Sequence, residues 1–317
     1  MKVLVTGSSG YVGMVLSRHL SERGADVIGL DVKGNRAWKG NDHFRFIECD
    51  VTDNGKVEEV FRSERPTHVI HLAYLMNPLH NKKREYEIDV EGSKNVFKAA
   101  IGAPSVKQFI QMSSTSAYGA WPDNRPWIKE EAPLRPRGYR YGINKKEVEE
   151  YMNYFRKRTH LKLVILRMCT AVGSSYHKKG GVVSILAKAP VLTKIGNRYA
   201  EVQFIHEDDL TAIIDLILGD PDIEGTFNLA PDSFATTREL SRAKLAVPVP
   251  LFLMKGLTSV LWVLHIASMR APAIELSTYG IVADPKKLMK SLNYRFKYGT
   301  REAYFHTVEE RKKRGTL

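Results

Sequence analysis

Two polar side chains four residues apart have the types needed for proton transfer. Tyr141 and Lys145 stand at positions i and i+4 of an expected helix, so both project from the same helix face. A neighbouring ammonium group favours the tyrosinate form and lowers the pKa of a phenol. Tyr141 can then act as a general base on an alcohol, or as a general acid on a carbonyl in the reverse direction. The pair alone also suits an ordinary surface contact, so a catalytic prediction depends on the surrounding motifs.

A cluster of hydroxyl residues follows a strand-like run upstream of this pair. Residues 113–119 read Ser-Ser-Thr-Ser-Ala-Tyr-Gly. A hydroxyl group here could bond the reacting oxygen of a substrate and orient it toward Tyr141. Any single serine in such a place is also a common turn or cap residue.

A glycine-rich turn near the N-terminus offers a site for phosphate. Residues 6–13 read Thr-Gly-Ser-Ser-Gly-Tyr-Val-Gly between an apolar strand and an expected helix. The glycines permit a tight turn, and the helix N-terminus supplies free N–H groups for a pyrophosphate. The strand–turn–helix context makes this match more specific than a lone glycine triplet. We expect a dinucleotide bound by Gly7, Ser9, Gly10, Tyr11, Val12 and Gly13.

The dinucleotide is predicted to be NAD because of Asp31, at the end of the second expected strand. A carboxylate in this place bonds the ribose hydroxyls of NAD and repels the 2′-phosphate of NADP. Lys33 and Arg36 follow and could soften that preference. Asp50-Val51, after the third strand, is expected beside the adenine ring, although the same stretch suits a helix N-cap near Thr52 or Asp53.

Strands and helices alternate through the residues that must position these groups. The expected strands are Val3–Thr6, Val27–Asp31, Phe44–Ile47, Thr67–Ala73, Gln108–Ser113 and Leu163–Arg167. The expected helices are Tyr11–Arg23, Asn54–Arg65, Glu85–Ala100 and Tyr139–Arg158. Apolar strands separated by helices indicate a parallel sheet covered on both faces. Right-handed crossovers then favour a doubly wound, Rossmann-type α/β fold.

The regular pattern weakens after about Gly173, where glycine and proline separate shorter elements. We therefore expect an NAD-binding Rossmann domain over residues 1–173. Residues 174–317 are expected to form mainly a smaller substrate-binding region, with some segments returning to the sheet. Within it, Leu251–Ala267 is predicted to be a partly buried helix, too short to span a membrane; contact with a membrane surface is the alternative. The charged tail Glu309–Arg314 is expected to fray into solvent.

Composition excludes several classes of protein. With 43% hydrophobic and 26% charged residues, the 317-residue chain can build a sizeable core. Its net charge of +13 comes without a nucleic-acid recognition motif, so a solvated basic surface is the favoured explanation and no nucleic-acid partner is expected. Cys49 and Cys169 lie in apolar runs and suit buried free thiols in a reducing compartment. The histidines show no metal-ligand spacing, and the chain begins directly with a strand, so we expect a cytoplasmic protein without a metal site.

Taken together, these motifs resemble the extended short-chain dehydrogenase/reductase family, and within it the NAD-dependent epimerase/dehydratase group. The likeness extends over nearly the whole chain. Further segments that carry it are His71–Ala73, Asp89–Val96, Leu166–Gly173, Phe204–Leu210 and Gly225–Leu229. The second of these resembles a family helix that usually begins with asparagine, whereas this chain has Asp89.

The resemblance implies a role for particular residues. The catalytic hydroxyl aligns with Ser114, with Thr115 as the alternative, and Tyr141 and Lys145 carry over directly. Lys145 would also hold the nicotinamide ribose. The full set of expected cofactor contacts is Gly7, Ser9, Gly10, Tyr11, Val12, Gly13, Asp31, Asp50, Val51, Leu72, Ala73, Tyr141, Lys145 and Met168. Thr115 and Thr170 are the expected substrate contacts, and the family's four-helix contact implies a homodimer through the helices near 85–100 and 139–158.

The chain departs from its relatives at three places that concern the substrate. Sugar dehydratases carry an Asp-Glu pair where this chain has Thr115-Ser116, so dehydration is not expected. Nucleotide-sugar enzymes usually have asparagine where Thr170 stands, and arginine just before the Phe204 landmark, where this chain has Val202-Gln203. Lys178, Lys179, Lys194 and Arg198 could replace the lost charge.

Three functions remain open from the sequence. The first is hydride transfer at a carbinol carbon by an epimerase that acts on a nucleotide sugar. The second is a dehydrogenase or reductase of a less polar alcohol or ketone, sterol-like or polyketide-like, which the apolar segment Leu251–Ala267 favours. The third is a non-catalytic NAD-binding or RNA-binding relative, which the combination of Ser114, Tyr141 and Lys145 disfavours.

Overall fold

The chain forms two compact units, and each unit is assembled from several segments. The computed structural model describes residues 1–34, 41–176 and 181–317, so Arg36, Lys178 and Lys179 lie outside the described residues. The first unit comprises Met1–Ser113, Asn144–Leu166 and Thr211–Phe227. The second unit comprises Ser114–Ile143, Arg167–Leu210 and Asn228–Leu317.

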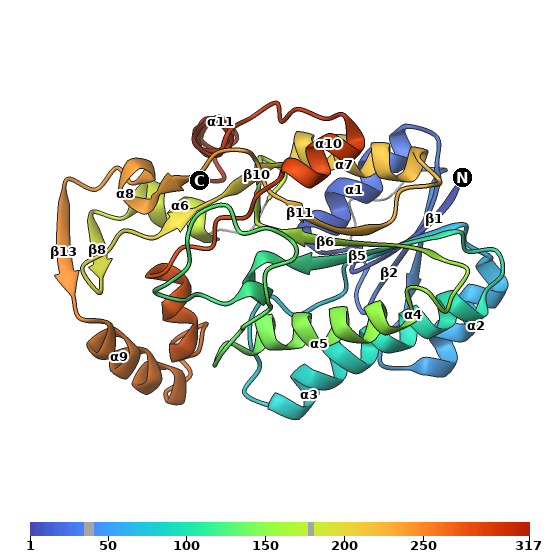
Figure 1. Ribbon diagram of the computed structural model, residues 1–317, viewed down its shortest axis with the longest axis horizontal. Helices are drawn as coiled ribbons and strands as arrows, with labels where there is room; N and C mark the ends of the chain where they lie inside the picture. The colour runs from blue at the N-terminus through green and yellow to red at the C-terminus, as the bar shows by residue number, and fades with distance from the viewer. Residues whose placement is uncertain (35–40, 177–180) are drawn as a thin grey trace. The chain divides into compact units, whose positions relative to one another are not determined.

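A seven-stranded sheet lies at the centre of the first unit (Figure 1). Its strand order is β11-β6-β5-β4-β1-β2-β3, and the pairs between β3 and β5 are parallel. The strands are β1 (Lys2–Thr6), β2 (Asp26–Asp31), β3 (Phe44–Glu48), β4 (His68–His71), β5 (Gln108–Ser114), β6 (Lys162–Met168) and β11 (Gly225–Leu229). The order reverses at β1, as in doubly wound sheets that bind ligands at such a switch point. The predicted Rossmann-type fold is confirmed.

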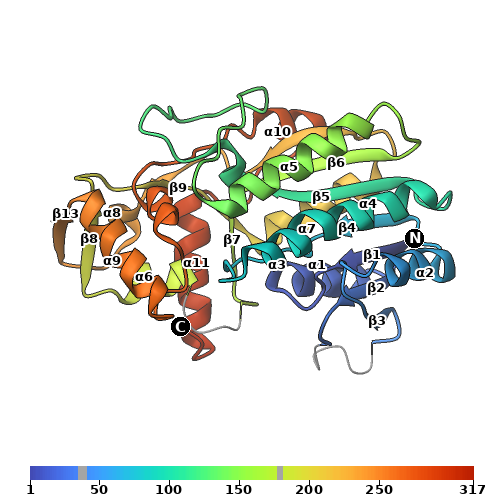
Figure 2. The same ribbon diagram turned by 90° about the horizontal axis from the view of Figure 1, so that it is seen from below.

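Helices cover both faces of this sheet, with α1 and α7 on one face and α2, α4 and α5 on the other (Figures 1 and 2). The helical segments are α1 (Tyr11–Glu22), α2 (Asn54–Glu64), α3 (Lys82–Tyr86), η2 (Glu87–Glu91), α4 (Gly92–Gly102), α5 (Arg140–Phe155) and α7 (Glu207–Gly219). Phe97 of α4 and Met152 of α5 pack in one buried cluster with Leu4 of β1. Such a cluster is the stabilising core of the unit because it removes apolar surface from water.

One predicted helix is more complicated than the sequence suggested. The helix expected over Glu85–Ala100 is interrupted by a π-helical turn, η2, before α4 begins at Gly92. A π turn inserts an extra residue into the α-helical register, and such turns occur frequently at functional sites. Here the turn contains the buried Asp89.

Both cysteines are buried free thiols, as predicted. Burial raises the pKa of Cys49 to about 11 and also raises the pKa of Cys169. Neither thiol therefore has the thiolate character that nucleophilic or redox chemistry needs.

The second unit is built from short elements and three small two-stranded sheets, β10-β7, β12-β9 and β13-β8. Its strands are β7 (Thr170–Val172), β8 (Val191–Ile195), β9 (Glu201–Val202), β10 (Phe204–His206), β12 (Ala235–Thr236) and β13 (Leu245–Val249). Its remaining helical segments are η3 (Thr115–Tyr118), α6 (Gly181–Lys188), α8 (Thr237–Leu240), α9 (Leu251–Val263), η4 (Ala271–Ser277), α10 (Lys286–Leu292) and α11 (Thr300–Lys313).

The C-terminal helix contradicts the prediction of a fraying tail. Helix α11 continues to Lys313, and Arg311 within the predicted tail is only 1% exposed. Tyr304 and Val308 of the same helix join the buried cluster of the second unit. The charged sequence did not indicate this burial, because the buried face of α11 is narrow. Arg311 buries its side chain, and its guanidinium donates to the Thr316 carbonyl.

The predicted helix in Leu251–Ala267 is present as α9, but it is less buried than expected. Thr258 is its only buried residue, and several of its large apolar side chains are exposed. No helix in the described part of the chain is both long and apolar enough to cross a membrane.

Candidate active site

The turn between β1 and α1 has the geometry that the glycine pattern predicted. Gly7 has φ +69°, a region that side chains disfavour, and a Cβ on it would lie 2.8 Å from the Ala73 nitrogen. A Cβ on Gly13 would lie 2.1 Å from the Gly7 carbonyl oxygen. Gly10 caps α1, and its N–H donates to the Gly7 carbonyl at 3.0 Å. Helix α1 therefore begins directly against the turn, with Tyr11 and Val12 half-buried in its first turn.

Asp31 fixes one side of this turn. Its carboxylate accepts hydrogen bonds from the Ser9 N–H at 3.0 Å and from the Val32 N–H at 2.8 Å. The Ser9 hydroxyl donates to the Lys33 carbonyl at 2.6 Å. These bonds bring the predicted phosphate-binding and ribose-binding residues together in one unit.

Asp50 lies in the first unit and has several partners of its own. Burial alone would raise its pKa, but hydrogen bonds from Thr52 and Arg84 outweigh burial and hold the pKa of Asp50 below its usual value. Val51 is buried against Gly92. A Cβ added to Gly92 would lie only 2.6 Å from the Val51 side chain. Asp53 caps α2 through the Lys56 N–H, so the cap interpretation of this stretch is confirmed. The adenine contact of Asp50 and Val51 stays a prediction.

Leu72 and Ala73 are half-buried at the end of β4, where Thr6 orders their backbone. The Thr6 hydroxyl oxygen accepts from both of their N–H groups, at 3.1 and 3.2 Å. Thr6 is also 2.7 Å from Nδ1 of His71, whose Nε2 is 2.9 Å from the Ser93 hydroxyl. Complete burial lowers the pKa of His71 to about 3, with Lys145 acting in the same direction. The imidazole is therefore neutral and structural.

Lys145 of α5 is buried, and its side chain reaches strand β5 of the first unit. Its ammonium nitrogen donates to the Met112 carbonyl at 2.7 Å and lies 3.5 Å from the centroid of the Tyr74 ring. Burial lowers the pKa of Lys145, while the carboxylates of Asp89 and Glu149 oppose that effect. Burying an ammonium group costs free energy even when a carbonyl, a ring face and two acids stabilise it. Such buried charges cluster at functional sites, which favours a catalytic role.

Asp89 and Asn144 belong to the surroundings of Lys145, and the sequence analysis did not assign them to the site. The Asp89 carboxylate accepts from the Leu75 N–H at 2.9 Å and from the Asn144 amide at 3.2 Å. Burial raises the pKa of Asp89, and these bonds together with Lys145 oppose the rise. The available signal was Asp89 itself, which stands where the family helix usually begins with asparagine.

Ser114 and the first residues of α5 belong to the same segment of the second unit, Ser114–Ile143. Ser114 is 8% exposed, and its hydroxyl oxygen accepts the Ser116 N–H at 3.1 Å, which caps η3 and leaves the hydroxyl proton to donate. Thr115 is buried next to it. A Cβ on Gly142 would lie 2.5 Å from the Ser116 carbonyl oxygen, so α5 packs directly on this turn at the residue after Tyr141. Tyr141 is half-buried, and the same helix carries Lys145.

Two further predicted residues, Met168 and Thr170, belong to the second unit. Met168 ends β6 and is half-buried, whereas Thr170 begins β7 and is exposed. Gln203, which stands near the family's arginine position, is buried. Its amide donates to the Pro231 and Ala283 carbonyls and accepts the Ala283 N–H at 2.7 Å. All its polar atoms are used by backbone, so Gln203 cannot replace the arginine.

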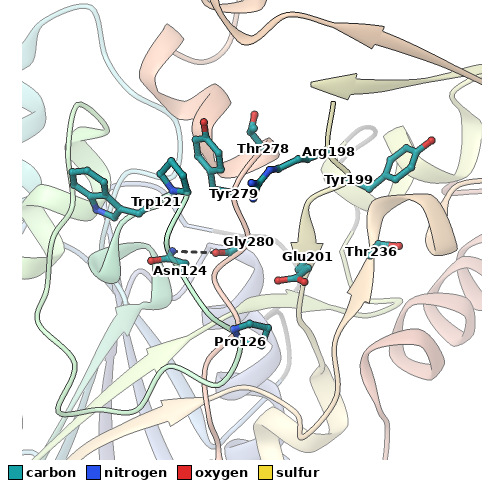
Figure 3. A pocket seen from close by; sticks show the side chains of 11 residues that line it. Trp121, Asn124, Pro126, Arg198, Tyr199, Glu201, Thr236, Thr278, Tyr279 and Gly280 are labelled. Atoms are coloured by element: carbon teal, nitrogen blue, oxygen red, sulfur yellow. Dashed lines mark hydrogen bonds between the residues drawn. The ribbon is translucent and has the colours of Figure 1, made fainter. Parts of the chain in front are cut away.

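A pocket of about 410 Å³ lies within the second unit (Figure 3). Its walls include the aromatic side chains of Trp121 and Tyr279, and the Asn124 amide bonds the Gly280 carbonyl at 3.1 Å. Two charged side chains, Arg198 and Glu201, also line it. Aromatic walls with a few charged or polar groups are typical of sites for polar small molecules.

The charges in this pocket are of opposite sign. The Arg198 guanidinium carbon lies 5.9 Å from the centroid of the Tyr279 ring, and Figure 3 shows the two side chains close together. In the part of the chain that the structure describes, neither Arg198 nor Glu201 forms an ion pair. The pocket therefore offers one cation and one anion for an incoming ligand.

The fold and the glycine-rich turn define a dinucleotide-binding α/β enzyme with a Tyr–Lys pair on one helix. Residues 3–230 match the NAD dependent epimerase/dehydratase family. The chain therefore belongs to this family and is an NAD-dependent enzyme of the extended short-chain dehydrogenase/reductase type, as predicted.

Several known proteins are similar to this chain. An uncharacterized protein of Mycobacterium tuberculosis is 25% identical over 95% of this chain and 82% of its own length. A UDP-glucose 4-epimerase of Lactobacillus helveticus is 34% identical over 55% of this chain and 53% of its own length. The solved structure of a Thermus thermophilus UDP-glucose 4-epimerase in complex with NAD has a TM-score of 0.79 at 25% identity and covers both chains completely.

Proposed function

We propose that this protein is an epimerase that inverts a carbinol centre of a nucleotide-sugar substrate. The observation that carries the proposal is the packing of α5 on the turn after β5, which brings the helix turn of Tyr141 against the segment that begins with Ser114. Both are groups that can exchange a proton with a substrate oxygen. NAD supplies the hydride acceptor and donor when bound.

Each residue of the proposed site has a distinct task. The Ser114 hydroxyl donates to the substrate oxygen and orients it. Tyr141 takes the proton from that oxygen as the carbonyl forms and returns it when the alcohol is restored. Lys145 holds the nicotinamide ribose and favours the tyrosinate through its positive charge. Asp31 bonds the adenosine ribose, and the glycine-rich turn binds the pyrophosphate at the N-terminus of α1.

The pocket of the second unit supports a substrate that has both hydroxyl groups and negative charge. Arg198 can pair with a phosphate, Glu201 can accept hydrogen bonds from sugar hydroxyls, and Trp121 or Tyr279 offers a flat surface for a ring. The similarity to two UDP-glucose 4-epimerases supports the same class. The homodimer also remains our proposal, through α4 and α5.

A second candidate, a dehydrogenase or reductase of a less polar alcohol or ketone, is favoured by one specific observation. Gln203 is buried and fully bonded to backbone near the position where nucleotide-sugar enzymes usually have arginine. A site without that arginine has less charge for a diphosphate.

One purification separates the two candidates. The protein is isolated without added nucleotide and denatured, and released dinucleotide is quantified by mass spectrometry. Near-stoichiometric NAD supports the epimerase, because its cofactor is regenerated in place. Incubation with UDP-glucose should then give its 4-epimer, detected by NMR, without net change at the nicotinamide absorbance band. Little bound NAD, together with NADH formation from an apolar alcohol, would establish the second candidate instead.

A further inference from the structure

The second unit carries an exposed apolar surface that its own fold does not cover. Helix α9 presents Phe252, Leu257 and Val263 to solvent with exposed fractions of 72%, 55% and 75%. The turn after it adds Ile266, and the paired strand β13 before it adds Leu245, at 69% and 58%. Figure 1 shows α9 following directly from β13. We call these five side chains, with their apolar neighbours on the same segment, the α9 surface.

This surface is held in place at one edge and left open elsewhere. The Lys255 ammonium pairs with Glu275 of η4 at 2.6 Å, and Thr258 is the only buried residue of the helix. The polar Lys255 and Thr258 lie on the side toward η4, so the exposed side of α9 is the apolar one. An apolar helix face normally packs against a protein core or lipid. Several large apolar side chains that are exposed together on one segment mark an interaction site.

The charges around the α9 surface indicate what covers it. Between Glu239 and Glu275 the sequence contains no acidic residue, and its charged residues are Arg242, Lys244, Lys255 and Arg270. Arg242 and Lys244 are exposed directly before β13. Glu275 is paired with both Lys255 and Arg137. An apolar helix bordered by cations complements the apolar interior and anionic headgroups of a charged lipid bilayer.

We propose that the α9 surface docks this protein onto an anionic membrane. Phe252, Leu257 and Val263 enter the boundary between headgroups and acyl chains, and the basic residues beside β13 contact the headgroups. At roughly 1.5 Å per residue α9 is about 20 Å long, well short of the ~30 Å hydrocarbon core. The helix therefore lies on the membrane and does not cross it.

Flotation with lipid vesicles tests this proposal on the full chain. Wild-type protein should float with vesicles of phosphatidylglycerol and phosphatidylcholine, and much less with pure phosphatidylcholine. Leu257→Glu should weaken binding to the anionic vesicles about tenfold or more, because it removes a large apolar side chain from the contact and adds a negative charge.

Leu216→Glu is the matched control, because Leu216 is an exposed leucine on helix α7 of the first unit and the variant adds the same charge. It should bind the anionic vesicles close to wild type. Equal NAD affinity in both variants shows that each has folded. Failure of the wild-type protein to float, or equal loss in the two variants, would overturn the proposal. So would a dimer in light scattering that Leu257→Glu alone dissociates, since the surface would then be covered by a second copy.

Discussion

At the scale of single residues, Tyr141 tests the proposed chemistry most directly. Tyr141→Phe removes the hydroxyl that exchanges the proton, and turnover should fall about 10²- to 10⁴-fold, the usual contribution of a general acid or base. The affinity for NAD, measured by titration, should change little. Tyr139→Phe is the matched control, because its ring lies only 5.7 Å from that of Tyr141. Normal turnover by Tyr141→Phe would remove the tyrosine from the mechanism.

Asp89 should set the pH range of activity through Lys145. Burial lowers the pKa of Lys145, and the Asp89 carboxylate counteracts this. Asp89→Asn removes the counteracting charge, so the pKa of Lys145 falls further. Since the proposed mechanism needs the ammonium form, activity is present below that pKa and is lost as the pH rises through it. The alkaline limb of the pH–rate profile should therefore move to lower pH.

The control for this shift lies on the same helix as Lys145. Glu150→Gln alters an exposed acid that pairs with Lys146 at 3.6 Å, and its alkaline limb should coincide with that of wild type. An Asp89→Asn profile that stays in place or moves to higher pH would show that Asp89 does not act through Lys145.

How much of the site was predictable differs from residue to residue. Gly7, Gly13 and Asp31 could be assigned because local chain order places them, and the structure brings them together in one unit. Asp89 could not, since its bond with Asn144 and its position near Lys145 depend on long-range packing of two helical segments. Arg198 was one of the cations that the sequence offered as a replacement for the lost charge, whereas Glu201 was hidden, because only the fold of the second unit brings it into the same pocket.

At the scale of elements, Gly13 controls how closely α1 approaches the turn. Gly13→Ala would place a methyl group 2.1 Å from the Gly7 carbonyl oxygen, so the helix N-terminus must move away from the phosphate site. At about 1–3 kcal/mol for such overpacking, NAD affinity should drop roughly 5- to 150-fold in calorimetric titration. Gly102→Ala, where nothing lies within 4 Å, should bind NAD normally. Unchanged affinity in Gly13→Ala would mean that the turn tolerates displacement.

The sequence predicted secondary-structure elements most accurately where a strand is buried on both faces of the sheet. The strands around β1 were predicted well because a sheet covered on both faces needs continuous apolar runs. The apolar run of α9 indicated a partly buried helix, and the structure leaves most of its large apolar side chains exposed. The π turn at Glu87–Glu91 has no periodic signature in so short a segment.

At the scale of the whole molecule, the chain passes repeatedly between its two units instead of completing one before the other. Helix α5 illustrates this, because its first residues belong to the second unit and the rest to the first. The predicted boundary after residue 173 also expected later segments to return to the sheet, and β11 is such a segment. The predicted catalytic pair lies on helix α5, with Tyr141 in the part that belongs to the second unit and Lys145 in the part that belongs to the first.

The end of the chain completes the core of the second unit, and this leads to a stability prediction. Tyr304 is 1% exposed, and its ring stacks with Phe204 of β10 at 5.9 Å. Tyr304→Ala should lower the free energy of unfolding by about 3–5 kcal/mol, the usual cost of removing a buried aromatic ring. Urea denaturation followed by circular dichroism measures this change.

A second substitution at the same position separates the ring from its hydroxyl. The Tyr304 hydroxyl has no hydrogen-bond partner among the described residues, so Tyr304→Phe removes a buried polar group that gains nothing from folding. It should keep or slightly raise the free energy of unfolding, while the exposed Glu309→Ala on the same helix should change it by less than about 0.5 kcal/mol. If Tyr304→Ala were as stable as Glu309→Ala, α11 would not contribute to this core. A large loss confined to Tyr304→Ala would instead establish that the last helix is required to close this core.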